Sequence, residues 1–411
     1  MFQYESKNGD KIALKLPLAT AEDPQGKILE GATEVRSHMG ALGTGNDNLI
    51  GLKGVIRTPD GIGIAMEFAP NGNVFDMAAL IQQHVTNGTL TPDEAKILQL
   101  TMLQDMAEGM RHIQEDQGMI HLDFKTPNCL IDKDGKVKIS DFGTTRSGTG
   151  ISYVDIPAGI DNPRWKSPEL LHAKGTASSL RQFNDPRVAG RKQLVTAQLT
   201  SAFPNAKVTS TGFNNLLRAI MRPDVDSGVN QLRVNNKTDS WGLGVSALNI
   251  FTGKELLKDE KYDSNVETRL TQWANDPQSG AALGPKNGPL PQGALTKGTG
   301  FGDVDTLINE LMHRDPNQRP SFTQVLQDPI FAELGDGSTR ARELLVALRS
   351  GVQTNIDGAR LALSQVSKLP PPPPTPPNNL QPQPGTNLPP PPPPLQGQPG
   401  TNLPPPPPPL V

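Results

Sequence analysis

Four polar residues stand close together in one stretch of the sequence, HLDFKTPNCLIDKDGKVKISDFG, residues 121–143. They are Asp123, Lys125, Asn128 and Asp141. Carboxylate and amide oxygens are hard ligands of the kind that Mg²⁺ takes, and a lysine ammonium neutralises phosphate charge. Two carboxylates, an amide and an ammonium in one place therefore predict a site for a divalent metal together with a phosphate group. A surface turn with solvated charges is the alternative interpretation, and so specific a spacing argues against it.

A tight hairpin is predicted to bring these residues together. Asn128–Ile131 and Val137–Ile139 have the composition of two short strands, and Asp132–Gly135 has that of a turn. Because the flanks of so short a hairpin meet, Asp123 and its neighbours are expected to lie beside Asp141.

The residues before this stretch predict a small sheet followed by a long helix. The segments 4–16 and 54–68 read as two hairpins, with a helix over 30–42 between them. Thr91 and Glu94 form a capping box, which predicts that a long helix starts there. Its expected buried face recurs every three or four residues and consists of Ala95, Leu98, Met102, Met106, Met110 and Ile113.

Composition narrows the classes of function. The 411 residues are enough for two domains, and a net charge of −3 gives no bulk electrostatic case for nucleic-acid or membrane partners. The single cysteine, Cys129, excludes an internal disulfide framework and suits a reducing compartment. The N-terminus lacks the apolar core of a secretory signal, and no stretch approaches the roughly 18 apolar residues that cross a bilayer. We therefore expect a cytoplasmic protein, in the host cytosol if it is a secreted bacterial effector.

The stretch 121–143 resembles the catalytic and metal-binding loops of eukaryotic-type protein kinases, which read H-R-D-x-K-x-x-N and D-F-G. The resemblance implies a two-lobed α+β fold, with a small β-rich N-lobe and a large helical C-lobe, that binds ATP and Mg²⁺. It makes Asp123 the catalytic base that accepts the substrate hydroxyl proton and Lys125 the residue that steadies the γ-phosphate. Asn128 and Asp141 match the two metal ligands.

Motifs on both sides of this stretch agree with the resemblance in their order. Lys15, at the end of IALK, matches the lysine that grips the α- and β-phosphates, and Glu34 is the best match for its ion-pair partner, with Glu30 nearby. The segment 65–72, AMEFAPNG, resembles the linker between lobes, whose backbone holds adenine. The residues expected at the cofactor are Lys15, Glu34, Met66 (behind the base), Glu67, Ala69, Asn128 and Asp141. Asn73 and Asp76 are candidates for ribose contacts or, equally, loop and helix-cap residues.

Three further residues match structural positions of the family. Glu169, in NPRWKSPEL, matches the buried acid at the end of the activation segment, and Arg319 is its expected partner. Asp239, in DSWGLG, matches the acid that binds the backbone of the catalytic loop.

Two departures bear on activity. No G-x-G-x-x-G precedes Lys15, so we expect either a start codon assigned too late or a kinase that lacks this lid over the phosphates and has lower nucleotide affinity and rate. Leu122 replaces the usual arginine that pairs with a phosphate on the activation segment, which leucine cannot do. Activity is therefore expected without phosphorylation of Thr144, Thr145, Ser147, Thr149, Ser152 or Tyr153.

The predicted organisation has four parts. They are an N-lobe (1–69) that is truncated at its start and lacks its first strand, a C-lobe (70–332) with an insert near 175–232, a helical extension (333–367) and a disordered proline-rich tail (368–411). The insert is rich in Arg and Lys and either docks a partner or is a solvated helical excursion. In the extension, Ser338 is expected to cap a helix that Gly351 ends, and a second helix is expected to carry Ile356, Leu361, Leu363 and Val366.

The tail repeats LPPPPPPL with a period of fifteen residues. Such tracts form polyproline II helices, which aromatic-lined domains bind readily. The predicted partners are profilin and EVH1, SH3 or WW domains, and a spacer without a partner is the alternative.

The expected function is transfer of the ATP γ-phosphate to Ser/Thr hydroxyls of a protein substrate. Lys125 in DFKTPN follows the Ser/Thr pattern, whereas RWKSPE is slightly tyrosine-kinase-like. The alternatives are a pseudokinase scaffold that acts through the tail, which the missing Gly-rich loop favours, and a small-molecule kinase.

Overall fold

A computed structural model gives the fold of the chain. It describes residues 2–5, 11–16, 24–58, 61–148, 151–155, 163–167, 169–170, 196–197, 231–256, 266, 270, 299–313 and 315–366. All of them lie within residues 1–372, one of two compact units into which the chain divides, the other being 373–411. Most of the predicted insert at 175–232 and the whole proline-rich tail at 368–411 lie outside the described residues.

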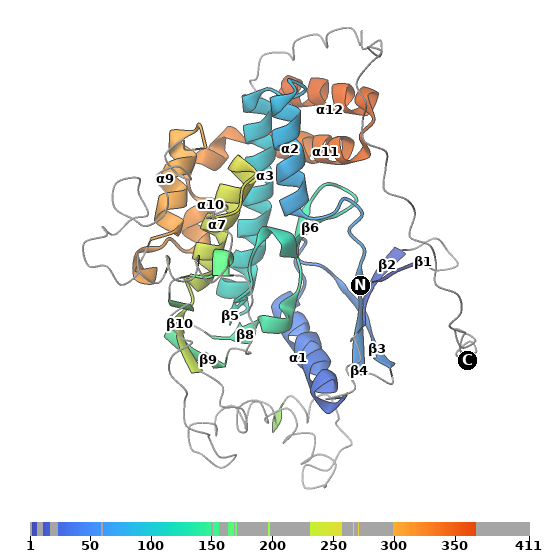
Figure 1. Ribbon diagram of the computed structural model, residues 1–411, viewed down its shortest axis with the longest axis vertical. Coiled ribbons are helices and arrows are strands. Elements are labelled where there is room, and N and C mark those ends of the chain that lie inside the picture. The colour runs from blue at the N-terminus through green and yellow to red at the C-terminus, as the bar shows by residue number, and fades with distance from the viewer. Residues whose placement is uncertain are drawn as a thin grey trace. The chain divides into compact units, whose positions relative to one another are not determined.

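A four-stranded antiparallel sheet and one helix make up the N-terminal lobe (Figure 1). Its strands, in the spatial order β1-β2-β4-β3, are β1 (Phe2–Glu5), β2 (Lys11–Lys15), β4 (Gly61–Glu67) and β3 (Leu52–Thr58). Both predicted hairpins are confirmed, since β1 pairs with β2 and β3 pairs with β4. Helix α1 (Pro24–Leu42) packs against β4 and is longer than the predicted 30–42.

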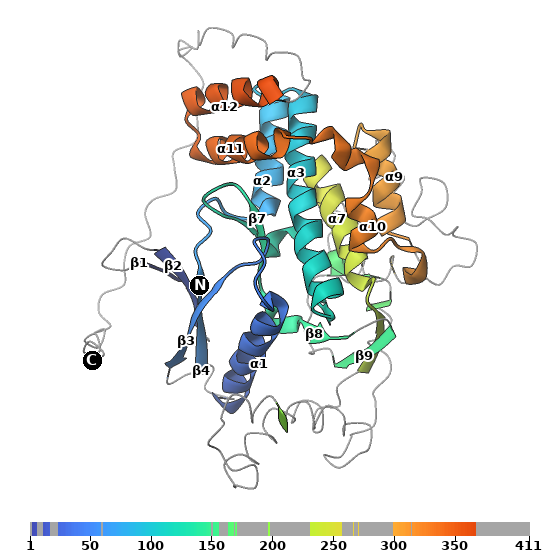
Figure 2. The same ribbon diagram turned by 180° about the vertical axis from the view of Figure 1, so that it is seen from behind.

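Helices dominate the C-terminal lobe (Figure 2). They are α2 (Val74–Thr86), α3 (Pro92–Arg111), α7 (Thr238–Thr252), α9 (Gly302–Leu311) and α10 (Phe322–Leu326). Helix α3 is central and contacts α2, α7 and α10. The predicted capping box is present: Thr91 Oγ1 accepts from Glu94 N, and Glu94 accepts from Thr91 N. All six residues of the predicted apolar face are buried in one core cluster. A small sheet lobe and a large helical lobe confirm the expected α+β fold.

Two more helices, α11 (Gly337–Ser350) and α12 (Gln353–Val366), extend the helical lobe and cross α2 and α3 near one end (Figure 1). Gly351 ends α11 with a φ of 69°, as predicted, but the N-cap is Asp336. The prediction for Ser338 was wrong because the chain turns into the helix two residues earlier. The expected second helix, α12, is present and carries all four apolar residues, of which Ile356 and Leu363 are buried and Leu361 and Val366 are exposed. These two side chains are 52% and 43% exposed because α11 covers only one face of the helix.

None of the helices in the described ranges has both the length and the hydropathy that crossing a bilayer requires.

Candidate active site

The predicted catalytic hairpin is present. Strands β6 (Cys129–Ile131) and β7 (Val137–Ile139) pair in register, and a short 3₁₀ turn, Thr126–Asn128, precedes them. Asp132 Oδ1 accepts N–H bonds from Asp134 and Lys136, which closes the turn. Burial raises the pKa of the Cys129 thiol in β6, so this cysteine is an unreactive core residue.

Asp123 is held by two of the residues predicted to act with it. Lys125 Nζ lies 2.8 Å from each carboxylate oxygen of Asp123. Asn128 Nδ2 donates to both the backbone oxygen and Oδ2 of Asp123, each at 2.9 Å. Charge-assisted bonds of this kind fix the orientation of the carboxylate.

A buried acid from helix α7 anchors the loop that carries Asp123. Asp239, 2% exposed, accepts the backbone N–H of His121 at 2.7 Å and that of Leu122 at 2.9 Å. Leu122 has a φ of 67°, in the left-handed region that is unfavourable for a non-glycine residue. The two bonds to Asp239 hold the loop in this conformation, and the Leu122 side chain is buried at 3% exposure.

Lys15 joins the sheet lobe to the hairpin. Its Nζ lies 2.7 Å from Glu34 Oε1 on α1 and 2.9 Å from Asp141 Oδ1. Burial alone would lower the pKa of Lys15, but the charges of Asp141 and Glu34 outweigh it and raise the pKa. Burial would likewise raise the pKa of Asp141, but the Lys15 charge outweighs it and lowers the pKa. Glu34, the preferred candidate, therefore pairs with Lys15, whereas the side chain of Glu30 lies outside the described residues.

Phe142, which follows Asp141, packs between two histidines. Its ring is 1% exposed, stacks on His38 with ring centroids 4.5 Å apart, and lies 5.6 Å from the ring of His121. His38 Nε2 donates to the Ile50 carbonyl at 2.7 Å, and burial lowers the pKa of this histidine. The sequence reasoning missed His38, whose one local signal was its place one helical turn after Glu34 on α1.

The linker between the lobes is bonded to the hairpin. Ile131 N donates to the Gly72 carbonyl at 2.8 Å, and Asn71 N donates to the Ile131 carbonyl at 3.1 Å. Met66 is buried with Ile50 and Ile64, and Ala69 packs against this cluster. The predicted site residues Met66 and Ala69 therefore belong to the same apolar cluster.

Glu67, also predicted at the cofactor, uses its side chain elsewhere. Glu67 Oε2 accepts from Gly51 N at 3.2 Å and forms an ion pair with Lys138 Nζ at 3.2 Å. Its backbone N–H is engaged as well, since Glu67 N donates to the Gly51 carbonyl at 2.8 Å. Asn73 caps helix α2 by accepting from Asp76 N at 2.8 Å, which confirms the helix-cap part of the expectation, and the ribose contacts stay a prediction.

The segment after Asp141 is fixed by hydrogen bonds at its start. Thr144 Oγ1 donates to the His121 carbonyl at 2.9 Å, and Ser37 Oγ on α1 donates to the Thr145 carbonyl at 2.9 Å. Arg146 Nη1 binds the carbonyls of Gly143 and Thr145. Further along, Arg319 and Glu169 make the expected pair.

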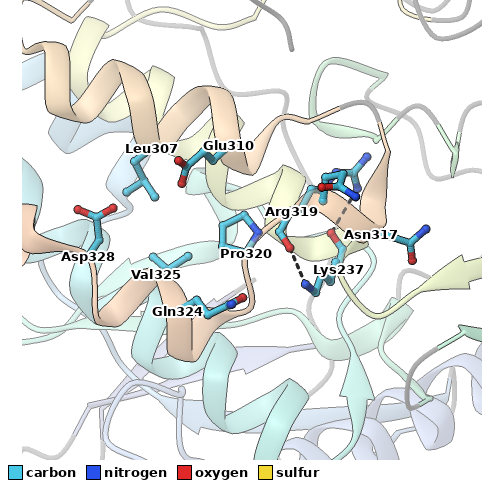
Figure 3. Close-up of a pocket in the computed structure, with 10 residues that line it drawn as sticks. Lys237, Leu307, Glu310, Asn317, Arg319, Pro320, Gln324, Val325 and Asp328 are labelled. Atoms are coloured by element: carbon cyan, nitrogen blue, oxygen red, sulfur yellow. Dashed lines mark hydrogen bonds between the residues drawn. The ribbon is translucent and has the colours of Figure 1, made fainter. Parts of the chain in front are cut away.

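The Arg319–Glu169 pair is bidentate and buried. Arg319 Nη1 and Nη2 lie 2.6 and 2.9 Å from the two carboxylate oxygens of Glu169, and the arginine side chain is 0% exposed. A cavity of about 340 Å³ lies next to Arg319, between α9 and α10 (Figure 3). There Lys237 and Arg319 exchange hydrogen bonds through their backbone carbonyls. None of the predicted catalytic or cofactor residues lines this cavity.

The donor atoms beside the hairpin fit a hard divalent cation. Asn128 makes its side-chain bonds through Nδ2, which leaves the amide oxygen as a ligand. The backbone oxygen of Asn128 accepts from both N and Oγ of Ser140, so Asn128 is tied to the residue before Asp141. The described residues contain no cluster of three or more His, Cys, Asp or Glu side chains that could hold a metal by itself. A cation here would therefore complete its shell with phosphate or water oxygens.

The site thus supplies the Asp123 carboxylate, which Lys125 orients, and oxygens of Asn128 and Asp141 for a cation. It also supplies a second ammonium, that of Lys15, between the acids Glu34 and Asp141. This set can hold a charged phosphate chain and accept a proton from a hydroxyl group close by.

Comparison with known proteins points in the same direction. Residues 3–182 match the family model of the protein kinase domain. The chain is 30% identical over 322 residues to dual specificity protein kinase pyk3 of Dictyostelium discoideum, covering 78% of this chain and 17% of that protein. It is 30% identical over 166 residues to the probable serine/threonine-protein kinase SIS8 of Arabidopsis thaliana, covering 40% of this chain and 15% of that protein. It is also 35% identical over 100 residues to the cytoplasmic tyrosine-protein kinase BMX of Mus musculus, covering 23% of this chain and 15% of that protein. The chain thus spans less than a fifth of the length of each of these relatives.

Proposed function

Since the chain belongs to the eukaryotic-type protein kinases, we propose that it transfers the γ-phosphate of ATP to serine or threonine hydroxyls of a protein substrate. The observation that carries the proposal is the convergence of Lys15, Glu34 and Asp141 beside an Asp123 that Lys125 and Asn128 already hold.

Each side chain has a role that its contacts support. Asp123 accepts the proton of the substrate hydroxyl, and the bonds from Lys125 and Asn128 keep its carboxylate in one orientation. Lys125 also carries positive charge to the transferred phosphate. Lys15, fixed by Glu34, neutralises the non-transferred phosphates.

ATP and a divalent metal belong to the function of this family, and we propose Mg²⁺ as the metal. The amide oxygen of Asn128 and the carboxylate of Asp141 would hold it, and it would supply positive charge to the phosphates. Met66, the backbone carbonyl of Glu67 and the backbone of Ala69 would hold the adenine base. The N–H of Glu67 donates to the Gly51 carbonyl, and the polar part of its side chain is engaged with Lys138.

Lysine at position 125 supports Ser/Thr rather than Tyr as the acceptor, because this residue is typical of Ser/Thr kinases. The relatives carry names of serine/threonine, dual-specificity and tyrosine kinases, so the acceptor needs its own measurement.

The test is phosphate transfer from labelled ATP in the presence of Mg²⁺ by the purified full chain, followed by phosphoamino-acid analysis. We expect label on phosphoserine and phosphothreonine, and none with Asp141→Ala. Label on phosphotyrosine alone would contradict the acceptor, and equal labelling by wild type and Asp141→Ala would contradict the site.

A catalytically weak scaffold is the second candidate, and one sequence feature favours it. No G-x-G-x-x-G stands among the residues that precede Lys15 in this sequence. In that function the repeated LPPPPPPL tracts would recruit profilin or EVH1, SH3 or WW domains in the cytoplasm. The scaffold would be favoured if neither wild type nor Asp141→Ala transferred label in the assay while the chain still bound such a domain.

A further inference from the structure

Helix α11, in the C-terminal extension, is linked to the catalytic hairpin through a partly buried ion pair with an acid on α3. Arg342 Nη2 lies 2.7 Å from Asp105 Oδ1, and Arg342 Nε lies 3.3 Å from Asp105 Oδ2. Asp105 is on α3 and its side chain is 4% exposed, whereas that of Arg342 is 22% exposed. The carboxylate also accepts the backbone N–H of Val137 at 3.0 Å through Oδ2. One carboxylate thus joins the extension to the first residue of strand β7.

The turn of the hairpin lies against the same helix. Gly135 has a φ of 80°, and a Cβ atom added there would collide with the backbone carbonyl of Arg342. Glycine is therefore required at this position both by its conformation and by the close approach of α11. Four residues after Val137 comes Asp141, which is bonded to Lys15.

The linker between the lobes meets α11 as well. Gly72 has a φ of 79°, and a Cβ there would lie 3.1 Å from Nη2 of Arg349. Because Gly72 accepts the backbone N–H of Ile131, the linker, the hairpin and α11 form one connected group.

We propose that Arg342 is a positioning residue for phosphate transfer. It compensates the buried Asp105 carboxylate, and Asp105 in turn fixes the start of β7 and, through this strand, the position of Asp141. Helix α11 is then part of the kinase machinery through the hairpin that it packs against. This inference rests on the proposed function.

The physical reason is the isolation of Asp105 once Arg342 is removed. A buried carboxylate without a countercharge is strongly unfavourable, so it would rotate toward water or draw water in. Val137 would then lose its hydrogen-bond acceptor, and β7 would shift. Displacement of a catalytic group by about 1 Å can lower a rate about 100-fold.

The chain offers two matched controls on the same pair of helices. Arg360 on α12 forms a bidentate pair with Glu94, with side-chain exposures of 4% and 5%, and Glu94 lies at the start of α3 rather than beside the hairpin. Arg340 on α11 forms an exposed pair with Glu343. Arg360→Leu therefore tests the loss of a buried pair elsewhere, and Arg340→Leu tests the loss of an arginine from the surface of α11.

The experiment measures kcat, Tm and backbone hydrogen exchange for the full chain and its variants. We expect Arg342→Leu to lower kcat at least tenfold and to speed exchange at residues 137–139. Both Arg342→Leu and Arg360→Leu are expected to lower Tm, by similar amounts, but kcat of folded Arg360→Leu should stay within about twofold of wild type. Arg340→Leu is expected to change neither Tm nor kcat. Adding Asp105→Asn to Arg342→Leu removes the uncompensated charge but keeps an oxygen for Val137, so most of the lost kcat should return.

Several results would overturn the proposal. The first is an Arg342→Leu variant that folds with kcat within twofold of wild type. The second is a loss of kcat in parallel with Tm in both Arg342→Leu and Arg360→Leu, and the third is the absence of any recovery on adding Asp105→Asn. If Arg342→Leu does not fold, Arg342→Lys keeps the charge with a single donor group and is expected to fold with kcat lowered about threefold; an unchanged kcat would count against the proposal. Hydrogen exchange is measured without ATP. If wild type transfers no phosphate, the proposed function is refuted, but exchange at residues 137–139 still decides whether Arg342 holds β7.

Discussion

Lys15 Nζ lies 2.9 Å from Asp141 Oδ1, although the two residues are 126 positions apart in the chain. The same ammonium lies 2.7 Å from Glu34 Oε1. A strand of the sheet lobe, helix α1 and the end of the catalytic hairpin are thus joined at one charged group. This arrangement brings the predicted phosphate-binding lysine and the predicted metal ligand into direct contact.

The Lys15–Asp141 pair predicts a stability contribution that is flat across neutral pH. The pKa of Asp141 is lowered, so its contribution is fully present above its unfolded pKa of about 3.9 and is lost as pH falls through the lower folded value. The pKa of Lys15 is raised, so its contribution is fully present below about 10.4 and is lost as pH rises through the higher folded value. Besides burial, the Lys15 charge also lowers the pKa of His38, which titrates below about pH 6.5, so the comparison is made above that range. The difference in free energy of unfolding between wild type and Lys15→Met, measured with urea, should be constant from about pH 7 to 9. A difference that changes steadily within that range would contradict the pairing.

His38 predicts a loss of stability in mild acid. Burial lowers the pKa of His38, so the unfolded chain takes up the proton first, at its pKa of about 6.5. The free energy of unfolding should therefore fall as pH drops below about 6.5, by at most about 1.4 kcal/mol per pH unit from this residue, until the folded pKa is reached.

The variant His38→Leu isolates this contribution. Its overall stability is expected to drop because the bond to the Ile50 carbonyl is lost, but its unfolding free energy should depend less on pH between 5 and 7 than that of wild type. Denaturant unfolding at several pH values gives the slope of unfolding free energy against pH for wild type and for His38→Leu. Equal slopes would show that His38 does not titrate in this way.

The start of the activation segment predicts activity without phosphorylation. Leu122 is buried and offers no positive charge to a phosphate, whereas Thr144 and Thr145 are held by His121 and Ser37 through neutral hydrogen bonds. A variant with all six hydroxyl residues between 144 and 153 changed to Ala or Phe should keep kcat within about tenfold of wild type, the loss coming from the Thr144 bond. Abolished transfer by this variant in a folded state would refute the prediction.

The Glu169–Arg319 pair predicts a large effect on stability. Removing one partner of a buried ion pair costs about 3–5 kcal/mol because the other charge is left without compensation. Arg319→Met should therefore lower the free energy of unfolding by about that amount, and Glu169→Met added to it should recover part of the loss. Urea denaturation of the single and double variants measures the coupling; a second loss that simply adds to the first would mean that the pair is not coupled.

Local spacing explains why the catalytic hairpin could be predicted from the sequence. Asp123, Lys125 and Asn128 lie within six residues, and a turn of fixed composition returns the chain toward Asp141, so short-range chemistry places all four. The capping box at Thr91 was predictable for the same reason.

Contacts that join distant segments could not be read in this way. Arg342 and Asp105 are 237 positions apart, and neither stands in a motif. Leu361 fits the apolar period of its helix and is nevertheless exposed, because only tertiary packing decides which face is covered. His38 lies at the right helical spacing from Glu34, but its role depends on the ring of Phe142, more than a hundred residues later.

The most direct test of the account is the binding of ATP to the full chain by calorimetry, with and without Mg²⁺, for wild type and Asp141→Asn. The central claim is that Lys15, Asn128 and Asp141 meet at one site for a metal and a triphosphate. Wild type should bind ATP at least tenfold more tightly with Mg²⁺ than without it, and Asp141→Asn should lose most of this difference. A wild-type affinity that Mg²⁺ does not change, or a Mg²⁺ effect that Asp141→Asn retains in full, would contradict the account.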